Sequence, residues 1–173
     1  MTEKMIVTEA TIDDCEAVAK LATQTFVDTF GHLYTDANRE RHISEKFSPA
    51  YFVKSLESGD TLLMLHDADT LVGYAKIGHL ELPVQPPIPK GAQEIHRVYI
   101  DKVYHGRGLG KAMMRYILSL PRIAAASRVY LGVWEENLKA QSLYTQFGFE
   151  PVGRYLYQVG DQFDREIIMA RVR

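Results

Sequence analysis

The sequence contains a single cysteine, Cys15, among 173 residues. One cysteine excludes an internal disulfide and argues against a cysteine-based metal site, so a reducing compartment fits best. The net charge is −2 and the pI near 6.3, so no global positive field indicates a nucleic-acid partner. No run approaches the roughly 20 apolar residues that span a bilayer, and residues 1–10 lack the apolar core of a signal peptide. These absences indicate a cytoplasmic enzyme or binding domain with no membrane partner.

The length and composition are typical of one globular domain. A chain of 173 residues, 46% of them hydrophobic, can bury a substantial core but is short for two domains. The proline-rich segment 83–91 cannot pair in a sheet, so we interpret it as an exposed loop within a single domain, residues 1–173. No metal is assigned, because no paired metal spacing is found among His32, His42, His66 and His79.

Hydrophobic periodicity predicts strands and helices that alternate along the chain. The predicted strands are residues 5–9, 61–66, 71–82, 93–101, 128–133, 149–158 and 166–172. The first predicted helix has an N-cap near residues 11–14 and breaks at Gly31. The other predicted helices are residues 36–47, 49–56, 109–120 and 138–147. Pro121 ends the third of these and Gly148 closes the fourth.

The order of these elements predicts the fold class. A strand, a helix and a strand in succession around residues 93–133 imply a right-handed crossover between parallel strands, and the hairpins on either side imply antiparallel pairs. We therefore expect an α/β fold with a mixed, mostly antiparallel sheet of about six or seven strands, a central parallel pair and about four helices on both faces.

The stretch from Arg97 to Lys111 carries the clearest chemical signal. A strand that leads through a glycine-rich turn into a helix leaves free backbone N–H groups at the positive end of the helix dipole, which suits a phosphate or pyrophosphate. The glycines at 106, 108 and 110 lack the G-x-G-x-x-G order of a dinucleotide site. Lys111 is followed by Ala112 and not by the Ser or Thr of a Walker loop, so both nucleotide interpretations fit poorly.

Two segments resemble motifs of the GNAT superfamily of acetyl-CoA-dependent N-acyltransferases. Residues 105–110, His-Gly-Arg-Gly-Leu-Gly, are similar to motif A, Gln/Arg-x-x-Gly-x-Gly/Ala, with His105 in place of the usual Gln or Arg. Residues 133–149 are similar to motif B, with Asn137 at the helix start, alanine three residues on, Tyr144 seven residues on and a closing Gly-Phe. The order of elements is similar as well, so the resemblance implies a GNAT-like fold over the whole chain.

The resemblance implies acetyl-CoA as cosubstrate and assigns residues to it. The strand around Val98–Ile100 is expected to splay from its parallel neighbour and to pair with the pantetheine arm. The amides of the turn are expected to hold the pyrophosphate, and Asn137 can cap its helix while its amide reaches the ligand. The expected cofactor-binding residues are Val98, Tyr99, Ile100, His105, Gly106, Arg107, Gly108, Leu109, Gly110, Lys111, Asn137 and Tyr144.

The implied mechanism is direct attack of a neutral primary amine on the thioester in a ternary complex. Tyr144 is the expected acid for the departing thiolate, as the matching tyrosine is in many family members. Glu94 and His96 are equal candidates for the general base. Strict alternation places Glu94, His96, Val98 and Ile100 on one face of the strand and Ile95, Arg97 and Tyr99 on the other, unless a bulge intervenes.

The acceptor is expected to be a small-molecule amine, bound by residues 26–47 and by the last hairpin near residues 158–164. Residues 25–34 and 97–100 are loosely similar to the polyamine-acetylating PaiA-type branch, and four carboxylates are candidates for binding a polycation: Asp28, Asp36, Glu40 and Glu45. The alternative is that these carboxylates form a solvated helix face. A protein N-terminus as acceptor and a non-catalytic acyl-CoA sensor on the same fold stay open, and family analogy alone suggests a homodimer.

Overall fold

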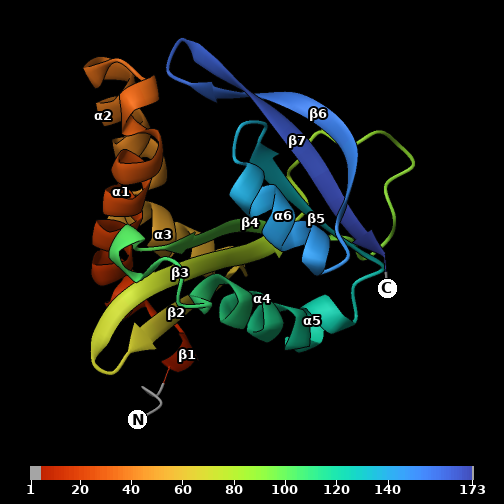
Figure 1. The fold of residues 1–173 in the computed structure, drawn as a ribbon, viewed down its shortest axis with the longest axis horizontal. Helices are drawn as coiled ribbons and strands as arrows, with labels where there is room; N and C mark the ends of the chain where they lie inside the picture. Colours follow the sequence, from red (N-terminus) through yellow and green to blue (C-terminus); the bar gives the residue numbers. More distant parts are fainter. Residues whose placement is uncertain (1–4, 173) are drawn as a thin grey trace.

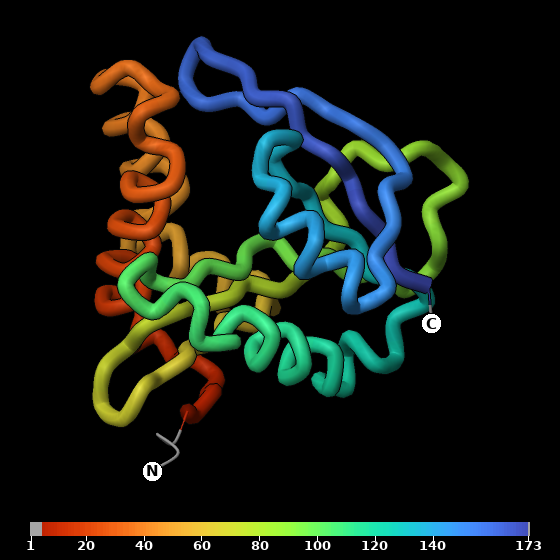
Figure 2. The backbone as a smooth tube through the Cα atoms, in the orientation of Figure 1, coloured from red at the N-terminus to blue at the C-terminus, as the bar shows by residue number. Residues whose placement is uncertain are grey.

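The computed structural model describes residues 5–172 (Figures 1 and 2), so residues 1–4 of the segment examined for a signal peptide lie outside the described residues. The strands are β1 (Met5–Glu9), β2 (Thr61–Asp67), β3 (Thr70–His79), β4 (Gln93–Ile100), β5 (Arg128–Trp134), β6 (Glu150–Val159) and β7 (Gln162–Val172). The helices are α1 (Cys15–Phe30), α2 (Asp36–Lys46), α3 (Pro49–Glu57), α4 (Leu109–Ser119), α5 (Pro121–Ala124) and α6 (Leu138–Gln146).

The strands form a seven-stranded sheet in the order β1-β2-β3-β4-β5-β7-β6. Strands β4 and β5 are parallel, and every other neighbouring pair is antiparallel. The predicted mixed, mostly antiparallel sheet with a central parallel pair is confirmed.

Two predicted boundaries differ from the structure by more than one residue, and one short helix, α5, was not predicted. Strand β3 ends at His79 and not at residue 82, because the amides of Glu81 and Leu82 donate to the Glu94 carboxylate at 2.7 and 3.0 Å and leave the sheet. Pro121 ends α4 as expected but also begins α5, since proline suits the first position of a helix. Strand β7 begins at Gln162, four residues before the predicted start, because the β6–β7 hairpin continues to a tight turn.

Helices cover both faces of the sheet (Figure 1). Helices α4, α5 and α6 pack on one face, and α1, α2 and α3 pack on the other. Strand β2 shows why its sequence is an unbroken apolar run: Leu63 and Leu65 belong to the first core, and Leu62 and Met64 belong to the second. A strand that is buried on both faces has no polar side to alternate with.

The β6–β7 hairpin reaches across to α2 and closes one side of the α1–α3 face (Figure 1). The Gln162 amide oxygen accepts hydrogen bonds from the backbone of Thr35 and the side chain of Asn38, both at 2.9 Å, and the Tyr34 hydroxyl bonds to Asp164. The loop between β3 and β4 lies near the opposite end of this hairpin (Figure 2), where Leu82 packs against the cluster that contains Ile168 and Ala170 of β7. The hairpin and this loop therefore border a space beside the central strands.

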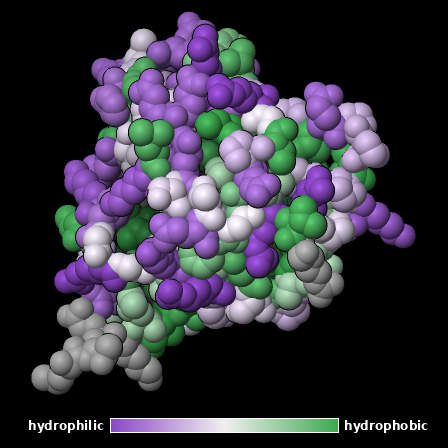
Figure 3. Space-filling view, turned by 45° about the vertical axis from the view of Figure 1, so that its right-hand side comes forward, coloured by the Kyte–Doolittle hydropathy of each residue, from purple (hydrophilic) through white to green (hydrophobic). Residues whose placement is uncertain are grey.

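The face of the molecule in Figure 3 is mainly hydrophilic, with small hydrophobic patches separated by polar residues. Within residues 5–172 no helix has the length and apolar character that a membrane crossing requires.

Candidate active site

Strand β4 carries a bulge at His96. Lys76 of β3 pairs with Arg97 and Ile77 pairs with Ile95, so His96 is the extra residue between them. Ile95 therefore packs in the α4–α6 core together with Val98 and Ile100, whereas Arg97 and Tyr99 face α1–α3. The bulge makes the strict alternation, which grouped Ile95 with Arg97 and Tyr99, wrong. The exception stated with that prediction, an intervening bulge, is confirmed.

The parallel strands β4 and β5 separate after three residue pairs. Gln93, Glu94 and Ile95 pair with residues 129–131, and beyond this point the two strands share no pairing among the described residues. A cavity of about 710 Å³ passes through the opening and receives side chains from both faces of the sheet. The backbone of residues 98–100 therefore has an open edge on the β5 side, as an added strand-like ligand would need.

The cavity brings together all but one of the predicted site residues. The residues that line it are Glu94, His96, Val98, Tyr99, Ile100, His105, Gly106, Gly108, Leu109, Gly110, Lys111, Asn137 and Tyr144. The exception is Arg107, which lies outside the cavity lining, pairs with Asp67 at 3.0 Å and stacks over the Tyr104 ring at 5.1 Å. Its expected role in binding the cofactor stays a prediction.

The glycine-rich turn has the shape of a phosphate cradle. Gly106 and Gly108 have φ values of +83° and +79°, and a Cβ built on either would meet nothing within 4 Å, so the space beside the turn is open. Gly108 is the N-cap of α4, whose first amides have no intrahelical acceptor. The His105 ring folds back, its Nε2 lying 2.8 Å from the Ile100 carbonyl, so this residue offers its backbone. These features fit a pyrophosphate.

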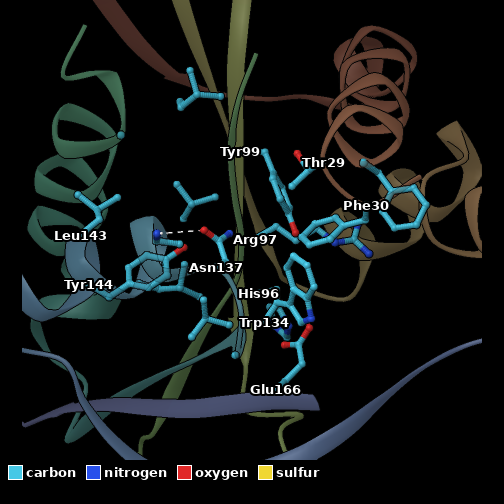
Figure 4. Close-up of a pocket in the computed structure, with 18 of the residues that line it drawn as sticks. Thr29, Phe30, His96, Arg97, Tyr99, Trp134, Asn137, Leu143, Tyr144 and Glu166 are labelled. Atoms are coloured by element: carbon cyan, nitrogen blue, oxygen red, sulfur yellow. Dashed lines mark hydrogen bonds between the residues drawn. The ribbon is translucent and has the colours of Figure 1, made fainter. Parts of the chain in front are cut away.

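Helix α6 presents Asn137 and Tyr144 to the same side of the cavity (Figure 4). The Asn137 Oδ1 caps the helix by accepting from the Ala140 amide at 3.1 Å, which leaves its NH₂ group for a ligand. Tyr144 is 9% exposed and its ring packs edge-on against Phe149. Burial first, and the Glu166 charge second, raise the pKa of Tyr144 to about 12, so the phenol keeps its proton at neutral pH.

Two substitutions separate the two roles of Asn137. Asn137→Asp keeps the capping oxygen and removes the NH₂ donor, so we expect the KM for acetyl-CoA to rise about two- to tenfold with an unchanged melting temperature. Asn137→Ala loses the cap as well and should lower the free energy of unfolding by about 1 kcal/mol. Thermal unfolding and steady-state kinetics check this; an unchanged KM in both variants would leave Asn137 as a cap only.

Glu94 and His96 lie together, and their side chains are only 7% and 8% exposed. The Glu94 carboxylate accepts from two backbone amides of the β3–β4 loop, and its Oε1 lies 3.2 Å from the His96 Nδ1. The His96 Nε2 lies against Gly78 of β3 and has no hydrogen-bond partner among residues 5–172. Glu94 therefore positions both the loop and the His96 ring, and its carboxylate is already heavily engaged.

Glu166 is a cavity carboxylate that the sequence did not indicate. It lies on β7 opposite Trp134, and its Oε2 accepts from the Tyr155 hydroxyl at 2.9 Å. Burial, the largest cause, raises its pKa to about 7, and the Tyr155 hydrogen bond opposes this shift. The sequence pattern could have indicated Glu166, because strand alternation places it on the same face as the buried Ile168 and Ala170.

The far half of the cavity is aromatic. Phe26, Phe30, Tyr34 and Phe47 line it from the α1–α3 side, and the Phe30 ring meets Trp134 of β5 edge-on at 5.9 Å. The cavity lining therefore includes several residues of the expected segment 26–47. It does not include the expected hairpin residues 158–164, which pack on α2 instead and leave this role to Tyr155, Tyr157 and Glu166.

The four carboxylates considered for a polycation do not line the cavity. Asp28 pairs with Lys102 at 3.0 Å, Asp36 with Arg39 at 2.7 Å, and Glu45 with Arg41 at 2.9 Å. Glu40 is exposed on α2. The structure therefore agrees with the alternative of a solvated helix face.

Neither a thiol nor a metal cluster is found in the cavity. Cys15 is 1% exposed at the start of α1, outside the cavity lining, and burial raises the pKa of its thiol. The described part of the chain, residues 5–172, has no group of three or more His, Cys, Asp or Glu side chains that could hold a metal ion.

A mixed sheet whose parallel central strands separate beside a glycine-rich helix start defines an acyl-CoA-binding transferase. Comparison with known families agrees: residues 16–149 match the acetyltransferase (GNAT) family, and the chain belongs to that family. It is an acetyl-CoA-dependent N-acetyltransferase, and the cavity described above fits acetyl-CoA, its cosubstrate.

Relatives and solved structures are consistent with this assignment. The chain is 31% identical over 161 residues to the N-alpha-acetyltransferase RimI of Mycobacterium tuberculosis, covering 91% of this chain and 87% of that protein. It is 36% identical over 81 residues to the spermine/spermidine N(1)-acetyltransferase of Bacillus subtilis, covering 46% and 53%. The fold is similar to that of the PaiA N-acetyltransferase of Thermoplasma acidophilum in complex with coenzyme A, with a TM-score of 0.75, 19% identity and coverage of 98% and 99%.

Proposed function

We propose that this enzyme transfers the acetyl group of acetyl-CoA directly to the primary amine of a small molecule in a ternary complex. The observation that carries the proposal is the continuous cavity through the β4–β5 opening. It joins the glycine-rich turn and Tyr144 at one end to an aromatic chamber at the other. An amine in the chamber can reach a thioester in the opening, and the buried Cys15 takes no part.

Different side chains of the opening stabilise the departing sulfur and accept the proton of the amine. Bound acetyl-CoA supplies the acetyl group as a thioester. Tyr144 donates a hydrogen bond to the sulfur as the carbon–sulfur bond breaks, and the new amide forms as the amine loses its proton. Three groups are candidates for accepting that proton: Glu94, His96 and Glu166.

Among these candidates we favour Glu166. Its pKa near 7 is matched to neutral pH, and its charge raises the pKa of Tyr144, which places the two groups within electrostatic reach of each other. The Glu94 carboxylate is already engaged by two backbone amides and by His96. Glu94 and the bulged residue His96 therefore serve as a positioning pair.

Two finer acceptors are suggested by the relatives. The Bacillus subtilis enzyme is named for spermine and spermidine, and RimI is named an N-alpha-acetyltransferase, which suggests an α-amine. Neither name assigns an acceptor here, and none of the four candidate carboxylates lines the cavity.

A thiol-release assay tests the proposal. Purified protein with acetyl-CoA is offered amino acids, neutral amines, polyamines and short peptides, and the acetylated product is identified by mass spectrometry. We expect turnover with at least one free small amine. Tight acetyl-CoA binding with no turnover on any small amine, or turnover on peptides only, would overturn the proposal.

A further inference from the structure

Two cations at one corner of the aromatic chamber have no carboxylate partner. Arg97 and Lys46 both line the cavity, and within residues 5–172 no carboxylate lies within ion-pair distance of either. Arg97 is held in place by a hydrogen bond from its Nη1 to the Lys46 carbonyl at 2.8 Å. Lys46 is exposed at the rim, and Arg97 lies deeper.

Unlike Arg97 and Lys46, the neighbouring buried Lys76 has a carboxylate partner. Lys76, on the adjacent strand, is 3% exposed and pairs with Asp60 at 3.0 Å. Arg97 lies instead over the rings of Phe47 and Tyr51, at 4.3 and 5.1 Å. Such cation–π contacts stabilise a partly desolvated guanidinium without neutralising it. Its full positive charge therefore acts on the cavity.

The nearby side chains respond to this charge. Burial first, and then the charges of Arg97 and Lys46, lower the pKa of His42 to about 4, so His42 is neutral at pH 7. Burial raises the pKa of Tyr51, but Arg97, Lys76 and Lys46 together outweigh it and lower that pKa overall. Glu45 opposes the shift of His42, but it is the smallest cause, and the pKa of His42 still falls. The corner therefore keeps a net positive potential, with no described carboxylate within ion-pair distance of Arg97 or Lys46.

A negatively charged side chain, Glu166, lines the same cavity. Glu166 acts electrostatically on Tyr99 and Tyr157, and so does Arg97, so these two tyrosines lie within reach of both charges. Glu166 and Arg97 are nevertheless not within ion-pair distance of each other, since no such pair is found between described residues. Figure 4 shows both side chains at the cavity, with Arg97 beside Phe30 and Glu166 beside Trp134. A ligand with two opposite charges can bridge them.

We propose that the acceptor is a small amine that also carries an anionic group, such as a carboxylate, which binds Arg97 and Lys46 while the amine lies toward Glu166. This inference rests on the proposed function and narrows its substrate class. A guanidinium fork suits the two oxygens of a carboxylate, and Lys46 adds a flexible charge at the rim. A polyamine, with its several positive charges, would meet like charges at this corner.

The test compares amines that differ only in the anionic group. Amino acids and ω-amino carboxylates with different spacers are assayed beside their carboxamides, together with spermidine, in the thiol-release assay with acetyl-CoA. For the preferred spacer we expect kcat/KM for the carboxylate to exceed that for its carboxamide by about 10- to 100-fold, the range of one charge-assisted hydrogen bond.

Two variants at Lys46 test the corner without disturbing the core. Lys46 is exposed, so Lys46→Glu and its matched control Lys46→Gln should both fold. Lys46→Gln should reduce the carboxylate preference a few-fold, and Lys46→Glu should reduce it further because it places a negative charge beside Arg97. Arg97→Gln should abolish the preference; circular dichroism and acetyl-CoA binding show whether that variant is folded.

The outcomes separate this inference from the proposed function. If small amines are acetylated but the carboxylates are no better than their carboxamides, or Lys46→Glu leaves the ratio unchanged, the anionic acceptor is wrong and the proposed function stands. If spermidine is the best acceptor, the anionic acceptor is equally wrong. If no small amine is acetylated, the proposed function itself fails.

Discussion

Replacing Tyr144 by phenylalanine is expected to lower kcat about 100- to 1,000-fold, the cost of removing one preorganised donor from a site of developing charge. A thiol ordinarily has a pKa of about 8.5, well below the value of about 12 for Tyr144. Complete proton transfer from Tyr144 to the thiolate is therefore uphill. The hydroxyl acts as a hydrogen-bond donor to the departing sulfur, and phenylalanine keeps the ring but not the donor.

The KM for acetyl-CoA should change little in this variant, because the ring contact with Phe149 and the glycine-rich turn are retained. Tyr116→Phe is the matched control: this tyrosine lies on α4 and does not line the cavity, so kcat should be unchanged. Steady-state kinetics with saturating amine distinguish the two variants. If Tyr144→Phe retains most of its kcat, Tyr144 only packs in the core.

The geometry of the candidate acetyl-CoA site could be predicted because it is local in sequence. A left-handed backbone at Gly108 and a helix cap at Asn137 are set within a few residues, so composition and spacing carry them. The bulge at His96 is different. It depends on the register that β3 imposes on β4, and no residue type in residues 93–101 requires it.

The acceptor half depends on contacts between distant segments. Glu166 enters the cavity because β7 pairs with β5, and Arg97 meets Phe47 and Tyr51 because the end of α2 and the start of α3 fold over β4. The solvated helix face, which the sequence analysis weighed against a polycation site, was readable from local spacing, however. The pairs Asp36–Arg39 and Arg41–Glu45 have i,i+3 and i,i+4 spacing on a helix, which predicts solvated ion pairs and not free carboxylates.

Glu166→Gln is expected to lower kcat/KM at neutral pH about 100-fold, the lower end of the contribution of a general base. A base must be deprotonated to act, so the wild-type rate should rise with pH through about 7 and level off above it. Glutamine cannot titrate, so the variant should lose this rise. The amide oxygen can still accept the Tyr155 hydrogen bond, so the geometry is retained.

The matched control is Glu81→Gln. Glu81 also lines the cavity, but its side chain is 70% exposed at the rim, so its pH profile should equal that of the wild type. A pH-dependence that persists in Glu166→Gln and disappears in His96→Asn would assign the base to His96 instead.

Thermal stability supplies an independent check on Glu166. Its folded pKa of about 7 lies above the ordinary value of 4.5, so the native state holds this proton more tightly than the unfolded chain does. The stability that the group contributes is complete below about pH 4.5 and is lost as the pH rises through 7. Glu166→Gln should therefore melt above the wild type at pH 8 and close to it near pH 4.5. A variant that is slow because its fold is damaged would melt lower at both pH values. The combination of a slower rate and a higher melting temperature at pH 8 therefore identifies a desolvated carboxylate kept for catalysis.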